Sequence, residues 1–291
     1  MFEGSMVAII TPFKKNKIDE KKLSELVEFH IKNGTSAIVP CGTTGESATL
    51  SIEEHERVID IVIEAASKKS AVIAGAGSNN TEEAIELTRH AKEAGADATL
   101  HITPYYNKPT QEGIYRHLSK IAAEVDLPLI AYNIQSRTGV NILPETMARL
   151  SKVKNIVGVK EASGNLEQMA KIYALCGKGF DLISGDDNLT LPLLAIGGVG
   201  VISVVSNIAP KDVSSMVSKF KKGDIEGARA LHYKLFPLVN AMFIETNPIP
   251  VKTAMKLLGM IDEGDLRLPM CEMSRENLEI LKKALKDYGL L

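Results

Sequence analysis

The chain has 291 residues, a formal net charge of −2 at pH 7 and an isoelectric point near 6.3. This balance argues against a basic surface for nucleic acid or an anionic membrane, and no apolar run approaches the roughly 20 residues that a membrane-spanning helix needs. At this length the chain can bury the core of one large barrel or of two smaller domains.

Short apolar runs alternate with amphipathic stretches almost to residue 220. We interpret eight of these runs as strands, at residues 6–10, 37–40, 71–75, 98–102, 128–132, 156–160, 181–184 and 200–204. Helical patterns follow them, for example at 53–67, 81–94 and 211–221. Near-continuous apolar strands that alternate with helices are typical of a parallel sheet. Eight such units favour an α/β fold of the (β/α)8 barrel type. No GxGxxG motif follows the first strand, which argues against a dinucleotide-binding fold.

The strand pattern stops after Gly223. Residues 224–239, 248–258 and 274–287 show helical patterns, and Ser274 is a suitable N-cap for the last of them. We therefore predict a barrel domain over residues 1–223 and a small C-terminal helical domain over residues 224–291.

Neither the cysteines nor the histidines form a recognisable ligand pattern. The cysteines are odd in number and widely spaced, which fits a reducing compartment, and they are Cys41, Cys176 and Cys271. The N-terminal residues lack the basic stretch and apolar core of a signal peptide. Residues 184–188 are acidic enough for a metal, but we favour a helix N-cap there. We expect a cytoplasmic protein without a metal site.

Lys160 ends the apolar run 156–160. A lysine is seldom buried without a specific role, and alternation along a strand places it on the same face as Gly158, which leaves space beneath the amine. Burial favours the neutral form of an amine, which is a nucleophile toward a ketone. The alternatives are a lysine that extends its ammonium to solvent and one that pairs with Glu161.

Further polar residues gather where the predicted strands end, the face on which barrel enzymes carry their active sites. Residues 41–47 combine glycines with hydroxyl groups and can present N–H groups to a carboxylate, or form an ordinary turn. Residues 103–109 contain two adjacent tyrosines, suited to proton transfer or to ring packing. Arg137 suits a substrate carboxylate, and a surface ion pair is its competing role.

Together these segments resemble the dihydrodipicolinate synthase family, and the resemblance rests on residues 42–47, 103–109, 136–139 and 158–165. It runs from about residue 4 to the C-terminus and includes residues 245–248. The family belongs to the pyruvate-dependent class I aldolases, which also include N-acetylneuraminate lyase. The resemblance implies an enzyme without a cofactor that condenses pyruvate with L-aspartate 4-semialdehyde through a lysine Schiff base. The product would be 4-hydroxy-tetrahydrodipicolinate, for lysine and diaminopimelate biosynthesis.

The resemblance also implies a role for each residue. The catalytic residues would be Lys160, which forms the imine, and a proton relay of Thr43, Tyr132 and Tyr106, the last reaching in from a neighbouring subunit. The substrate-binding residues would be Thr44, with backbone at Gly185 and Ile202, for the pyruvate carboxylate, and Arg137 for the carboxylate of the second substrate. A shared site of this kind implies a homo-oligomer, a tight dimer that pairs into a tetramer.

Some members of the family are inhibited by L-lysine, and the resemblance places that effector in a cleft at the tight dimer interface. The matching positions here are Ser47, Ala48, His55, Asn79, Glu83 and Tyr105. Glu83 can bind the ammonium group of lysine, while Asn79 and Tyr105 can bind its carboxylate. The alternative is that His55 and Glu83 only occupy the first turns of two surface helices, where an acid is favourable anyway. Ile52 stands where some inhibited members have a histidine.

Two further positions depart from the family pattern. Gln135 replaces a usual proline, so we expect a less rigid arm around Arg137. His101 replaces a small or aliphatic residue, and alternation counted from Thr103 predicts that it points into the barrel. The rival functions are another lyase of the group, acting on a sialic acid or keto-deoxy sugar acid, and an inactive barrel that binds an amino acid.

Overall fold

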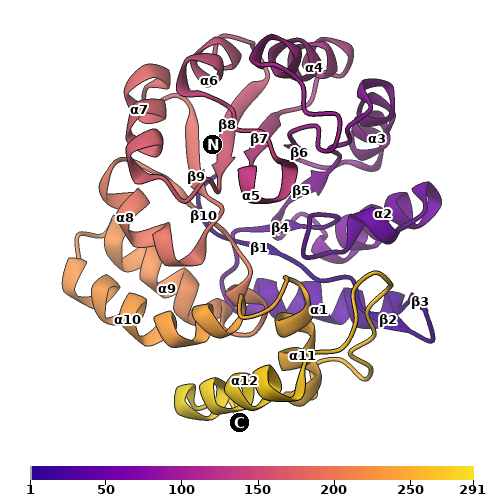
Figure 1. Ribbon diagram of the computed structural model, residues 1–291, viewed down its shortest axis with the longest axis vertical. Helices are drawn as coiled ribbons and strands as arrows, with labels where there is room; N and C mark the ends of the chain where they lie inside the picture. Colours follow the sequence, from indigo (N-terminus) through magenta and orange to yellow (C-terminus); the bar gives the residue numbers. More distant parts are fainter. Residues whose placement is uncertain (1) are drawn as a thin grey trace.

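Eight parallel strands close into a barrel at the centre of the molecule (Figure 1), and the computed structural model describes residues 2–291. β1 pairs with β10 on one side and β4 on the other, which closes the sheet. The strands are β1 (Gly4–Ala8), β4 (Ala37–Val39), β5 (Ala71–Gly75), β6 (Ala98–Ile102), β7 (Leu129–Asn133), β8 (Ile156–Glu161), β9 (Asp181–Ser184) and β10 (Gly200–Ser203). The predicted barrel is confirmed, and each predicted strand overlaps an observed one.

Helices surround the barrel on all sides (Figure 1). They are α1 (Glu20–Lys32), α2 (Ile52–Ala66), α3 (Thr81–Ala94), α4 (Gln111–Glu124), α6 (Pro144–Leu150), α7 (Leu166–Cys176), α8 (Thr190–Ala195) and α9 (Pro210–Lys221). The predicted helix 81–94 matches α3, whereas α9 begins one residue before its predicted start because Pro210 occupies the first helical position. A short hairpin, β2 (Phe13–Lys14) and β3 (Lys17–Ile18), precedes α1.

Side-chain alternation along the strands divides the core into two layers. The inner layer fills the barrel and consists of Met6, Ala8, Ala37, Val39, Ile73, Ala98, Leu100, Ile130, Tyr132, Ile183 and Ile202. The outer layer lies between the strands and the helices and contains the opposite faces of the same strands, for example Val7 and Leu182. The side chains of the inner layer therefore lie directly beneath the residues at the carboxyl ends of the strands.

His101 belongs to the outer layer, so the prediction that it points into the barrel is wrong. Its Nε2 lies 3.1 Å from Thr99 Oγ1 and 3.3 Å from Thr88 Oγ1 on α3. The prediction counted the alternation from Thr103, but β6 ends at Ile102. Leu100 and Ala98, which do lie in the strand, face the interior and place His101 on the outside.

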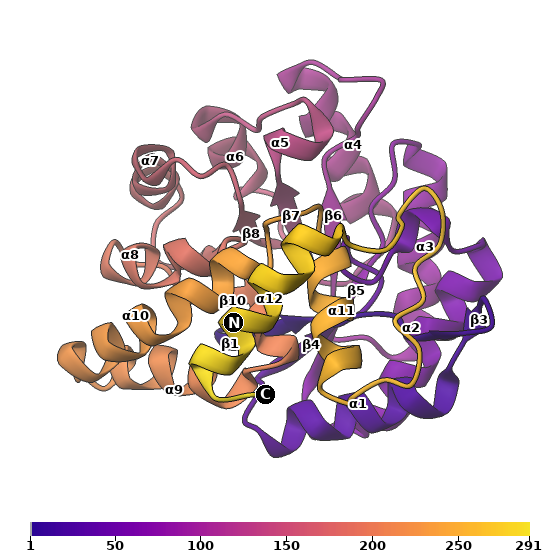
Figure 2. The same ribbon diagram turned by 60° about the horizontal axis from the view of Figure 1, so that its bottom comes forward.

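Three helices follow the barrel, and they are α10 (Ile225–Ala241), α11 (Ile249–Leu257) and α12 (Arg275–Tyr288). α10 packs along α9, and α12 packs against both α10 and α11 (Figure 2). Ser274 caps α12 as predicted, because its side chain accepts a hydrogen bond from Asn277 N. The predicted C-terminal helical region is confirmed, and its division from the barrel between residues 223 and 224 stays a prediction. Within residues 2–291, no helix is long and apolar enough to cross a membrane.

Candidate active site at the carboxyl ends of the strands

Lys160 lies near the carboxyl end of β8 and is only 6% exposed. Its neighbour in the sheet is Tyr132 of β7, and its Nζ lies 4.2 Å from the centroid of the Tyr132 ring. Tyr132 is itself 5% exposed. The structure thus brings together two of the predicted catalytic residues, an amine and a phenol, in a mostly apolar barrel interior.

The space around the amine comes from a different glycine from the one predicted. A Cβ on Gly158 would lie 2.6 Å from the backbone oxygen of Asp181, so this glycine admits the neighbouring strand β9. A Cβ on Gly185 would lie 3.1 Å from both Cγ and Cε of Lys160. Gly185, directly after β9, therefore leaves the room that the lysine side chain occupies.

The suggested pairing of Lys160 with Glu161 does not form. Successive residues of a strand point to opposite faces, and the buried Glu161 carboxylate accepts hydrogen bonds from Asn133 Nδ2 at 3.0 and 3.2 Å and from Ser163 N at 2.8 Å. Burial raises the pKa of Glu161, and these hydrogen bonds act in the opposite direction. Lys160 takes part in none of the ion pairs found within the described part of the chain, residues 2–291.

The turn after β4 holds Thr43 and Thr44. It folds back on itself, with Gly45 N donating to Gly42 O at 3.1 Å and Glu46 N donating to Thr43 O at 3.1 Å. Thr44 is buried, and its Oγ1 accepts a hydrogen bond from Asn247 Nδ2 at 2.9 Å.

Arg137 is carried by α5 (Gln135–Thr138), a short helix that follows β7. Its side chain is exposed, and Nη2 donates to Asn247 O at 3.0 Å. Thr138 Oγ1 donates to Ile134 O at 3.0 Å and accepts from Val140 N at 3.3 Å, which ties both ends of this arm. Gln135 is exposed at the first position of α5.

A cavity of about 380 Å³ opens between the β4–α2 turn, the loop after β6 and the arm of Arg137. Its lining includes Thr43, Arg137, Ser47, Ala48, His55, Glu83, Tyr105 and Asn247. Asn79 donates to Tyr105 O at 3.3 Å at its edge. The cavity therefore joins most of the predicted effector residues to two of the predicted active-site residues.

Tyr106 lies apart from the residues it was predicted to join. Its side chain is 90% exposed, and its backbone has a φ of 68°. A residue other than glycine seldom adopts a positive φ. Within one chain, this tyrosine is therefore held out into solvent.

The acidic segment after β9 provides one helix N-cap, as we favoured, because Asp186 caps the short 3-10 helix at residues 187–189. Asp186 accepts a hydrogen bond from Asn188 N at 3.0 Å, and the buried Asp187 accepts one from Val204 N at 2.9 Å. Burial raises the pKa of Asp187. No group of three or more His, Cys, Asp or Glu side chains in the part of the chain that the structure describes could hold a metal ion.

Sequence reasoning missed Asn247, which contacts both Thr44 and Arg137. It also missed Lys252, a fully buried lysine whose Nζ lies 2.6 Å from Glu46 Oε1. Both lie about 200 residues from the turn that they contact. The available signals were the family match at residues 245–248, which contains Asn247, and a lysine within the helical pattern of residues 248–258.

Comparisons with known proteins agree with one another. The model of the Dihydrodipicolinate synthetase family matches residues 1–288. The chain is 59% identical to "4-hydroxy-tetrahydrodipicolinate synthase" of Syntrophus aciditrophicus over the full length of both chains. It is similar, at a TM-score of 0.97 and 46% identity over all of both chains, to the structure of the chloride-inhibited dihydrodipicolinate synthase of Acinetobacter baumannii complexed with pyruvate. The structure of the Cyanidioschyzon merolae protein with lysine bound is also similar, with a TM-score of 0.97, 44% identity, and 100% and 99% of the two chains covered.

Proposed function

Because the chain belongs to the dihydrodipicolinate synthetase family, we propose that it is a 4-hydroxy-tetrahydrodipicolinate synthase, which condenses pyruvate with L-aspartate 4-semialdehyde. The observation that carries the proposal is a nearly buried lysine, Lys160, 4.2 Å from the ring centroid of Tyr132 in the barrel interior. No cofactor is needed, because the lysine imine itself serves as the electron sink.

The chemistry begins with attack of the Lys160 amine on the keto carbon of pyruvate. Water leaves and an imine forms. Loss of a proton from the pyruvate methyl group gives an enamine, whose carbon attacks the aldehyde of the second substrate. The amino group of that substrate then displaces Lys160 from the imine carbon, which closes the ring and frees the lysine.

Three hydroxyl groups would move the protons of these steps, those of Tyr132, Thr43 and Tyr106. Tyr132 lies beside the amine, and Thr43 lines the cavity next to the turn after β4. Thr44 would hold the pyruvate carboxylate together with backbone groups at Gly185 and Ile202. Arg137 would bind the carboxylate of the aldehyde substrate, since a guanidinium fork matches a carboxylate.

Incubation with pyruvate and borohydride, followed by mass spectrometry, tests the proposal directly. The reduced adduct is expected on Lys160 in the wild type and is expected to be absent in Lys160→Ala. Lys154→Ala is the matched control, because Lys154 is exposed and precedes the same strand. An adduct on a different lysine, or none in the wild type, would refute the assignment.

The rival lyases are separated by the second substrate. A sialic acid or keto-deoxy sugar acid is a long polyol, whereas the relative that is 59% identical over the full length of both chains is named 4-hydroxy-tetrahydrodipicolinate synthase. Competition between aldehydes for the trapped enamine distinguishes these enzymes. An inactive amino-acid-binding barrel would give no borohydride-trapped adduct on Lys160, so the trapping experiment separates it from an enzyme.

We also propose that L-lysine binds in the same cavity. Glu83 is half-buried there and accepts a hydrogen bond from Ser78 Oγ at 2.7 Å, so its carboxylate is held where an ammonium group could reach it. Burial, and secondarily Glu83, raise the pKa of Tyr105, which keeps this phenol protonated as a donor for the effector carboxylate. Calorimetric titration with L-lysine should give heat with the wild type and with Glu82→Ala, whose side chain is exposed on the same helical turn, but none with Glu83→Ala. No heat with wild type at millimolar lysine would refute the site.

The exposure of Tyr106 supports assembly, since a catalytic phenol in solvent has no role within its own chain. We propose that it completes the site of a second copy in a tight dimer, which pairs into a tetramer. Sedimentation measures the assembly, and a fully active monomer would refute the shared site. The three cysteines are free in the structure, which supports a reducing compartment such as the cytoplasm.

A further inference from the structure

A buried carboxylate and a buried ammonium pair behind the turn that carries Thr43 and Thr44. The Glu46 and Lys252 side chains are 2% and 0% exposed, and Lys252 Nζ lies 2.6 Å from Glu46 Oε1. Lys252 also donates to the backbone oxygen of Asp265. Since an unpaired charge is very costly in such a place, each of these two groups depends on the other.

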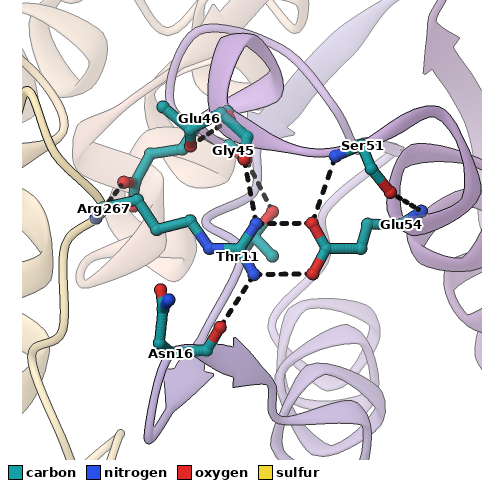
Figure 3. Close-up of polar contacts among 8 residues, drawn as sticks. Thr11, Asn16, Gly45, Glu46, Ser51, Glu54 and Arg267 are labelled. Atoms are coloured by element: carbon teal, nitrogen blue, oxygen red, sulfur yellow. Dashed lines mark hydrogen bonds and ion pairs between the residues drawn. The ribbon is translucent and has the colours of Figure 1, made fainter.

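Arg267 provides a second contact to the same carboxylate (Figure 3). Its backbone N–H donates to Glu46 Oε2 at 3.1 Å, and its guanidinium forms two hydrogen bonds with Glu54 at the start of α2. The Lys252 ammonium and the Arg267 guanidinium each lie 4.3 Å from the centroid of the Phe13 ring. Both oxygens of Glu46 are thus bound by the C-terminal region.

The backbone of Glu46 is also constrained. It lies in the left-handed region, with a φ of 54° and a ψ of 36°. This conformation is unfavourable for a side chain of this size and persists only where the surroundings enforce it. On the same turn, Gly45 O accepts a hydrogen bond from Thr11 Oγ1 at 2.7 Å (Figure 3).

One segment of the chain, residues 247–252, meets the turn at two points. Asn247 Nδ2 donates to Thr44 Oγ1 at 2.9 Å, and Lys252 binds Glu46 two residues further along the turn. The backbone oxygen of Asn247 accepts a hydrogen bond from Arg137 at 3.0 Å. This segment therefore connects the proposed pyruvate-carboxylate group to the proposed group for the second carboxylate.

We propose that Glu46, Lys252 and Asn247 are positioning residues, which hold Thr44 in register with Lys160 and set its place relative to Arg137. None of the three needs to touch a substrate. The inference rests on the proposed function, since it assigns the pyruvate carboxylate to Thr44. It makes the C-terminal helical region a structural part of the active site.

Lys252→Met is the main test, because methionine fills much of the same volume and leaves Glu46 without its cation. A misplacement of about 1 Å in a binding group can reduce a rate about 100-fold. We therefore expect kcat/KM for pyruvate to fall about 10- to 100-fold, through a rise in the KM for pyruvate that exceeds any change in the KM for the aldehyde. The double variant Glu46→Gln with Lys252→Met leaves no buried charge unpaired and should recover part of the loss.

Lys234→Met is the matched control. Lys234 of α10 lies 2.7 Å from Asp212 of α9 and 4.8 Å from the ring centroid of Tyr288 of α12, so its loss removes contacts of α10 with both helices without touching residues 247–252. We expect its KM for pyruvate to equal that of the wild type. An equal rise in both variants would show that the effect of Lys252→Met is general loss of stability, and would overturn the inference.

Hydrogen exchange gives a readout independent of activity. The amide of Glu46→Gln has one acceptor oxygen and cannot accept hydrogen bonds from both Lys252 Nζ and Arg267 N at the former positions. In this variant the peptide covering residues 42–50 should exchange at least about tenfold faster, while β8 stays protected. Unchanged exchange together with an unchanged KM would overturn the inference while borohydride trapping by the wild type still stands. Failure of trapping in the wild type would overturn the proposed function instead.

Discussion

Lowering the pH from 7 to 5 should destabilise the protein partly through His101. Its side chain is 0% exposed, and burial lowers its pKa to about 3, with His117 as a secondary cause. Its Nδ1 has no hydrogen-bond partner within the described chain. The folded protein therefore keeps this imidazole neutral at pH values where the unfolded chain would protonate it.

The sign and size of the effect follow from this difference. The pKa in the folded state lies below that of the unfolded chain, about 6.5, so stability is complete above pH 6.5 and is lost as the pH falls. At pH 5 the unfolded state gains roughly 1.4 kcal/mol for each pH unit below 6.5, or about 2 kcal/mol, while the folded state gains almost nothing. Against a total of about 5–15 kcal/mol for a domain, this is a measurable share.

His101→Leu isolates the contribution of this residue. Urea denaturation at pH 7 and at pH 5 gives the change in the free energy of unfolding for the wild type and for the variant, and the hydrogen bonds that the variant loses cancel between the two pH values. The decrease should be about 2 kcal/mol smaller in His101→Leu. In His232→Leu the reduction should be smaller, because burial of His232 is only partial. If wild type and His101→Leu lose equal stability, the imidazole is not held neutral and the reasoning fails.

Three further outcomes follow from the site and its supports. Gly185→Ala should slow borohydride trapping at least tenfold, since the new Cβ would lie 2.7 Å from Ala162 Cβ and 3.1 Å from two carbons of Lys160, the proposed imine-forming lysine. Gly179→Ala, with nothing within 4 Å, should leave the rate unchanged, and equal rates in the two variants would contradict this reasoning. Arg137→Ala should raise the KM for the aldehyde about 10- to 100-fold, as expected for loss of a charged hydrogen bond of about 1.5–3 kcal/mol, with little change in trapping; equal loss of both steps would indicate a structural arginine. Arg267→Met should reduce the free energy of unfolding by about 1.5–3 kcal/mol. Arg57→Met, which removes the exposed ion pair with Glu20, should reduce it by less than about 1 kcal/mol. Similar reductions in the two variants would argue against the Arg267 network.

The barrel was predictable from the sequence because its signals are local. Each strand is a short apolar run, and Ser274 marks a helix start within a few residues of the pattern that it caps. The error at His101 arose from one position at the end of β6, because alternation holds only where the strand continues. Lys160 was recognisable because an amine at the end of an apolar strand needs a reason to be there.

The support around the turn after β4 was not predictable in the same way. Glu46 and Lys252 are 206 residues apart, and Thr44 and Asn247 are 203 apart. No periodicity within one element reports a contact over such a distance. The need for a glycine at position 158 was also not predictable from its own strand. It arises from Asp181 on the neighbouring strand, whose backbone oxygen would lie 2.6 Å from a Cβ at this position.

These long-range contacts change the meaning of the predicted boundary between residues 223 and 224. A barrel ending at that point would contain every residue to which the resemblance assigns a catalytic or substrate-binding role. It would also leave the Glu46 carboxylate without Lys252 and Thr44 without Asn247. A buried carboxylate without its paired ammonium is no longer compensated, and we expect the turn that carries Thr43 and Thr44 to move. The C-terminal region therefore supports the proposed active site through Lys252 and Asn247, and the boundary between residues 223 and 224 stays a prediction.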